Sequence, residues 1–189
     1  MYKKIFIYGI AFGSIAGAFL FVHLNNYGPD MSNFQKIFFL LIYSLLLPAT
    51  CVYLLARNIR KDTLAKTTKG SKAGLVIIAG LFSMLVLSLT IAGIYAFIVA
   101  KFPDIIEKAI QTDLAKLNEN IDKYMEFYKK TKEEVIQMTV DRYSVGNQLR
   151  DNVYQFSSIG LLISSIMALI YMNKDRKRNA VNSEVKNDN

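Results

Sequence analysis

A run of twenty-eight residues without a charged side chain, from Ala73 to Ala100, constrains this chain more than any other feature. At about 1.5 Å per residue a helix over this run would be roughly 42 Å long, whereas the hydrocarbon core of a bilayer is about 30 Å thick. The run therefore predicts a transmembrane helix, over 73–101, that tilts or continues beyond the bilayer. A long charged segment follows it directly, so the chain is expected to leave the membrane there.

Three other apolar runs predict membrane-spanning helices over 5–24, 37–56 and 152–172. The first run continues past an Ala16-Gly17-Ala18 sequence that could otherwise be a signal-peptide cleavage site, so we expect an uncleaved span. Pro48 lies near the middle of the second run and predicts a kink, where Ser44 or Thr50 could bond the freed carbonyl. The expected fold is an all-α, polytopic membrane protein with four transmembrane helices.

Small residues recur every four positions in three of the predicted spans. Such a strip lets a second helix approach closely and gain dispersion energy inside the bilayer, where the hydrophobic effect is absent. We expect these strips to mediate helix packing, with packing inside the chain favoured over a homodimer contact. The strips are Gly9, Gly13 and Gly17 in the first span, Ser88, Ala92 and Ala96 in the third, and Gly160, Ser164 and Ala168 in the fourth.

Residues 102–151 predict a helical hairpin outside the membrane. Pro103 suits a first helical position, and Thr131 with Glu134 resembles a capping box that starts a second arm. Apolar side chains recur at steps of three and four along the first arm, as in a coiled coil. Because the second arm is shorter, part of this apolar stripe could remain exposed to a second copy or a partner protein, and pairing within the hairpin is the equal alternative. The stripe is Ile106, Ile110, Leu114, Leu117, Ile121, Tyr124 and Tyr128.

The distribution of basic residues predicts the orientation of the chain. The loop 57–72 carries six basic residues and one acidic residue, and more basic residues follow the last span. Cytoplasmic loops carry such an excess, so we expect both termini in the cytoplasm, the hairpin outside, and a multi-pass protein of the bacterial inner membrane. Residues 173–189 are polar and are expected to form a disordered cytoplasmic tail. The formal net charge is +8, and the basic residues flank the predicted spans. This placement favours contacts with anionic membrane lipids over nucleic-acid binding.

The sequence offers no constellation of catalytic or metal-binding residues. Its one histidine, His23, lies near the end of a predicted span, and its one cysteine, Cys51, lies within an apolar run. Neither is expected to act as a ligand or a nucleophile, and no cofactor or metal is expected. The interiors of the predicted spans carry no Asp, Glu, Lys or Arg, whereas ion pathways usually contain one. We therefore expect a non-enzymatic accessory or scaffold subunit that interacts through its hairpin, with a small transporter or channel subunit as the alternative.

Several short motifs resemble a domain-of-unknown-function family of small four-span inner-membrane proteins known from Bacteroidota. The resemblance extends over roughly residues 5 to 175. It implies the four-span topology and no particular activity. The motifs are Tyr8-Gly9, the Arg57 to Asp62 exit from the second span, Gly74-Leu75, Phe102-Pro103-Asp104 and Gly160-Leu161.

Overall fold

The structure, a computed structural model, describes residues 2–28, 31–63 and 69–187, and in these ranges it contains helices and no strands. Four stretches are long and apolar enough to cross a membrane: Tyr2–Asn26, Asn33–Ile59, Ala73–Lys101 and Val145–Lys174. The expected all-α, polytopic membrane architecture is thereby confirmed. The elements are α1 (Tyr2–Asn26), α2 (Asn33–Leu41), the π-helix η1 (Ile42–Leu46), α3 (Leu47–Thr63), α4 (Lys69–Lys101), α5 (Pro103–Asn118), α6 (Ile121–Tyr128), α7 (Lys132–Asp141) and α8 (Val145–Asn187).

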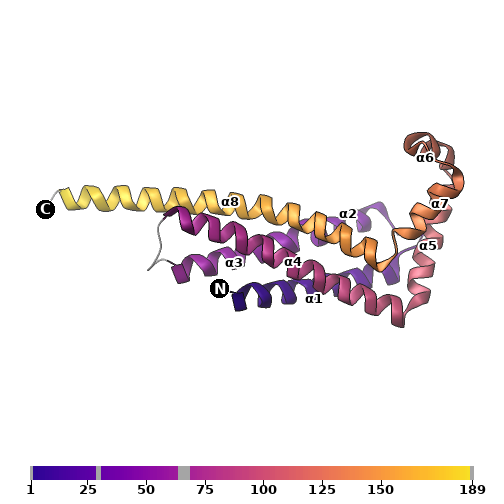
Figure 1. Ribbon diagram of the computed structural model, residues 1–189, viewed down its shortest axis with the longest axis horizontal. Helices are drawn as coiled ribbons and strands as arrows, with labels where there is room; N and C mark the ends of the chain where they lie inside the picture. The colour runs from indigo at the N-terminus through magenta and orange to yellow at the C-terminus, as the bar shows by residue number, and fades with distance from the viewer. Residues whose placement is uncertain (1, 29–30, 64–68, 188–189) are drawn as a thin grey trace.

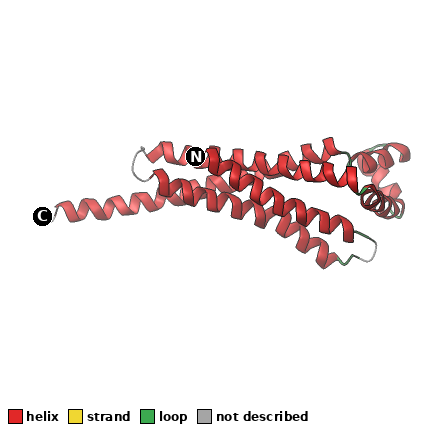
Figure 2. Ribbon diagram, turned by 90° about the horizontal axis from the view of Figure 1, so that it is seen from below, coloured by secondary structure: helices red, strands yellow, loops and turns green. Residues whose placement is uncertain are grey.

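The long helices lie side by side, and α4 is the central one (Figures 1 and 2). It packs most extensively against α8 and α1 and also contacts α3. A helix that is apolar on every side is stable where other helices surround it, which explains why the uncharged run occupies this position. Its side chains Met84, Leu87 and Ile91 are fully buried in the core.

The glycine strip of α1 lies directly against α4. A Cβ atom built on Gly9 would be 2.6 Å from the Val86 Cβ, and one on Gly13 would be 2.7 Å from the Thr90 Cβ. Only glycine allows the two helices to approach this closely. At Gly17, the added atom would meet the Ile94 side chain.

The strip of α8 lies against α4, where it meets Met84 and Gly80 rather than the strip of α4. A Cβ atom on Gly160 would be 2.3 Å from the Met84 Cγ, and one on Gly80 would be 2.6 Å from the Ser164 Cβ. Of the remaining strip residues, Ser88, Ala92 and Ala168 are buried and Ala96 is half-buried.

The second membrane-spanning stretch is irregular around Pro48. The π-helical turn η1 precedes the proline, and the N–H of Leu47 donates to the carbonyl of Ile42. The Thr50 hydroxyl donates to the Leu46 carbonyl at 2.8 Å, whereas the Ser44 hydroxyl accepts a hydrogen bond from the Gln155 amide of α8 at 2.5 Å. Because proline cannot donate an N–H, the backbone around it adopts this wider turn.

The helices extend beyond the spans expected from hydropathy. The basic end of the second stretch continues as α3 to Thr63, and α8 runs on to Asn187 through the residues 173–187 that were expected to be disordered. Neither glycine nor proline follows Gly160 in the sequence, so nothing local terminates α8 once it has formed. Part of the basic loop, residues 64–68 with Lys66, and the last two residues lie outside the described ranges.

Candidate functional site

Helices α5, α6 and α7, here called the cap (residues 103–141), lie at the end of the molecule opposite the chain termini (Figure 1). Pro103 occupies the beginning of α5, with Asp104 in its first turn. Helix α7 begins at the expected capping box, in which the Thr131 hydroxyl accepts from the Glu134 N–H and the Glu134 carboxylate accepts from the Thr131 N–H. The local chemistry of the sequence therefore defines where two of the three cap helices begin.

The apolar stripe is divided between two helices. A turn at Glu119 and Asn120 separates α5 from α6, because asparagine and its polar neighbours compete with helical hydrogen bonding. In α5, Ile106 and Leu117 are buried, and Ile110 and Leu114 are half-buried. In α6, Ile121 is half-buried, and Tyr124 and Tyr128 are exposed.

Asp113 joins the cap to the membrane-spanning helices. The Tyr27 hydroxyl donates to the Asp113 Oδ1 at 2.5 Å, and the Tyr143 hydroxyl donates to its Oδ2 at 2.8 Å. Lys116 Nζ lies 3.1 Å from the Tyr27 hydroxyl oxygen and 4.4 Å from the centre of the Tyr27 ring. The Tyr95 hydroxyl of α4 donates to the Tyr143 carbonyl at 2.7 Å. These bonds connect α5 to the end of α1, to α4 and to the turn before α8.

The electrostatics of this cluster favour a positioning role. Burial, followed by the hydrogen bond and the negative charge of Asp113, raises the pKa of both Tyr27 and Tyr143. Both phenols therefore stay neutral and act as donors at physiological pH. No group of three or more His, Cys, Asp or Glu side chains that could hold a metal ion occurs within the described ranges.

A small cavity of about 190 Å³ lies beside the cluster, between α5, α6 and α7. Its wall combines the charged groups of Asp113, Lys116 and Arg142 with the rings of Tyr124 and Tyr128. Asp113 and Lys116 belong to the network that holds the cap, and the two rings are exposed on the surface of α6.

Helix α6 presents an exposed aromatic tip, formed by Tyr124, Phe127 and Tyr128. Their exposed fractions are 42%, 77% and 40%, and no residue of α6 is buried. The Tyr124 and Tyr128 rings stack with centroids 6.4 Å apart, and the Phe127 ring meets Tyr128 edge-on at 5.0 Å. Together with Asn120 and Lys123 they line an open groove of about 400 Å³. The predicted apolar stripe did not include Phe127, although three aromatic residues within the five positions from Tyr124 to Tyr128 were a visible signal.

Polar side chains also occur inside the membrane-spanning bundle. The fully buried Ser83 and Ser88 hydroxyls donate to the carbonyls of Gly80 and Met84 in their own helix, each at 2.8 Å. Such bonds satisfy the hydroxyl groups locally and are typical of helix packing.

No protein-family model, curated protein or solved structure matches this chain. The aromatic tip is an exposed apolar surface outside the predicted membrane region.

Proposed function

We propose that this protein is a non-enzymatic accessory or scaffold subunit that holds a partner membrane protein through the aromatic tip. The observation that carries the proposal is the exposure of Phe127 between two tyrosines, on a cap tied to α1 and α4 through Asp113. Aromatic side chains are enriched in the energetically dominant parts of protein interfaces. Because the cap is held in place, little ordering is needed on binding, which favours affinity.

The proposed orientation has both termini in the cytoplasm, so that the aromatic tip and its partner lie outside the cytoplasm. The N-terminal end of α1, the ends of α3 and α4 that flank the basic loop, and the C-terminal part of α8 lie at one end (Figures 1 and 2). The excess of lysine and arginine at this end supports a cytoplasmic location there, in the bacterial inner membrane. A cysteine at Lys130, in a Cys51→Ala background, should then react with an impermeant maleimide in intact cells, whereas one at Lys69 should react only after lysis. The reverse pattern would refute the orientation.

The chemistry of the groove indicates what the partner presents. The groove is mainly apolar, and Lys123 is the charged residue in its wall. The complementary surface is a segment of the partner with an apolar face and a neighbouring carboxylate. Three aromatic side chains make a small interface, and confinement of both proteins to one membrane raises their effective concentration.

Site-specific photocrosslinking in intact membranes tests the proposal. A photoreactive amino acid at Phe127 should give an adduct with one particular membrane protein, and the same group at Glu133 on α7 serves as the control position. The variant Lys123→Glu should abolish the adduct, and an acid-to-lysine change in the crosslinked segment of the partner should restore it. An adduct with a second copy of this chain, or equal adducts at both positions, would overturn the proposal.

A further inference from the structure

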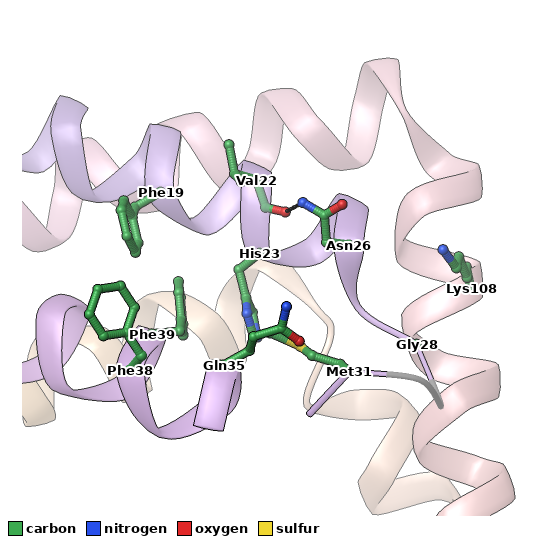
Figure 3. A pocket seen from close by; sticks show the side chains of 10 residues that line it. All are labelled: Phe19, Val22, His23, Asn26, Gly28, Met31, Gln35, Phe38, Phe39 and Lys108. Atoms are coloured by element: carbon green, nitrogen blue, oxygen red, sulfur yellow. Dashed lines mark hydrogen bonds between the residues drawn. The ribbon is translucent and has the colours of Figure 1, made fainter. Parts of the chain in front are cut away.

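A separate cavity of about 480 Å³ lies between α1 and α2 (Figure 3). Helix α2 packs mainly against η1 and makes no extensive contact with α1. The Phe39 ring bridges the gap, with its centroid 3.7 Å from the His23 ring, on which it stacks, and 5.8 Å from the Phe19 ring. The volume lies within the range of ordinary ligand sites, about 300–1,000 Å³.

The lining of this cavity changes from apolar to polar toward the ends of α1 and α2. Phe19 and Phe38 lie one to two turns inside the ends of their helices, whereas Asn26 and Gln35 lie at those ends. Phe38 is 51% exposed, so this side of the cavity borders the lipid region. A cavity with an apolar inner part, a polar rim and an opening toward lipid matches an amphiphilic molecule.

The rim offers hydrogen-bond donors and one positive charge. The Gln35 Oε1 accepts from the Ser32 N–H at 3.0 Å, which orients its amide group and leaves the Nε2 donors for a ligand. Lys108 reaches the rim from α5 outside the membrane, and a Cβ atom on Gly28 would be 3.9 Å from its Cε. Among the side chains that the structure describes, no carboxylate forms an ion pair with Lys108. The unpaired ammonium selects for a negatively charged group.

We propose that this cavity binds one membrane lipid with an anionic phosphate headgroup, drawn from the outer leaflet. Its glycerol and upper acyl region lies beside Phe19 and Phe38, and its phosphate accepts hydrogen bonds from Lys108 and Gln35. The lower acyl chain continues into the bilayer past the exposed edge of Phe38. This site is distinct from the aromatic tip and does not depend on the partner protein proposed above.

Native mass spectrometry of the purified full chain tests the proposal with defined lipids. Phosphatidylglycerol and phosphatidylcholine with identical acyl chains are compared at equal concentration. A lysine close to a lipid surface contributes about fivefold to the binding of an anionic lipid, so the wild type should prefer phosphatidylglycerol by at least this factor. Lys108→Gln should remove the preference and Lys108→Arg should keep it.

Matched controls distinguish a specific role of Lys108 from a general effect of removing a lysine. Lys108 and Lys130 are both exposed, so neither substitution is expected to disturb folding, and Lys130→Gln on the cap should leave the preference unchanged. An absent preference in the wild type, or an equal loss in Lys108→Gln and Lys130→Gln, would overturn the site. Inorganic phosphate should not displace the lipid at millimolar concentration; displacement would identify a free-phosphate site and contradict the lipid assignment.

Discussion

Replacing Gly9 with alanine should weaken the packing of α1 on α4, because the added methyl group has no room. Its Cβ would lie 2.6 Å from both the Cβ and the Cγ1 of Val86, and 3.0 Å from the Ser83 carbonyl oxygen. The Val86 Cβ is attached to the backbone of α4, so the clash is relieved only if the helices separate. Gly93 is the matched control, since a Cβ there meets nothing within 4 Å.

The expected cost follows from two opposing terms. Overpacking a close contact typically lowers the free energy of unfolding by about 1–3 kcal/mol. Replacing glycine by alanine in a helix has an intrinsic benefit of at most about 1 kcal/mol, which acts at both positions. The difference between Gly9→Ala and Gly93→Ala should therefore be about 1–3 kcal/mol, with Gly9→Ala the less stable protein.

A double-mutant cycle tests whether the loss of stability in Gly9→Ala arises from the contact with Val86. Val86→Gly removes the two atoms that would lie closest to the new methyl group and leaves the Ser83 carbonyl oxygen, so Gly9→Ala should cost less in that background, with a coupling energy of about 0.5–3 kcal/mol. Steric-trap unfolding in bicelles measures all the free energies under one condition. The reasoning is refuted if Gly9→Ala and Gly93→Ala unfold with the same free energy, or if Val86→Gly leaves the cost unchanged.

Four further outcomes concern the cap. Asp113→Ala removes the acceptor shared by Tyr27 and Tyr143 and should destabilise docking of the cap by roughly 1–3 kcal/mol, seen as faster hydrogen exchange in α5 with α4 unchanged. The pKa of each phenol is raised in the folded protein, so the stability that Tyr27 and Tyr143 contribute is present below the ordinary tyrosine pKa of about 10 and is lost as the pH rises through the folded values. Tyrosinate absorbance of the wild type, compared with a Tyr27→Phe/Tyr143→Phe variant, should show two tyrosines that ionise at unusually high pH. Thr131→Ala should destabilise α7 by about 1 kcal/mol, measured by exchange of its first-turn amides. The hydrogen bond from the Thr131 N–H lowers the pKa of Glu134. The stability that this carboxylate contributes is therefore present above the ordinary carboxyl pKa and is lost as the pH falls through the lower folded value. An NMR titration of Glu134 would detect the lowered pKa.

The sequence was most informative where one physical requirement dominates. The uncharged run from Ala73 to Ala100 has no stable environment except lipid or other apolar helices, so the membrane-spanning α4 could be predicted from it. The start of α7 could be predicted because Thr131 and Glu134 satisfy the first backbone donors by themselves. Both features depend on local chemistry and need no knowledge of which helices are neighbours.

Features that depend on tertiary neighbours could not be predicted in the same way. The period of the apolar stripe continues unchanged through Asn120, so it gives no sign that α5 ends there and α6 turns outward. The pairing of Tyr27 with Asp113 joins residues 86 positions apart. The cavity near Lys108 is lined by residues of α1, α2 and α5, and no residue pattern within any one of these helices indicates it.

The glycine strip on α1 has a consequence for how the protein is made. Its contact surface on α4, around Val86 and Thr90, is synthesised well after α1 itself. At translation rates of about 5–20 residues per second, roughly 4–15 seconds separate the two. During this interval α1 must remain in the membrane without α4, when the only other membrane-spanning stretch already made, among the described residues, is the one from α2 to α3. Insertion of α1 therefore precedes its assembly, and the ribosome sets the delay between the two.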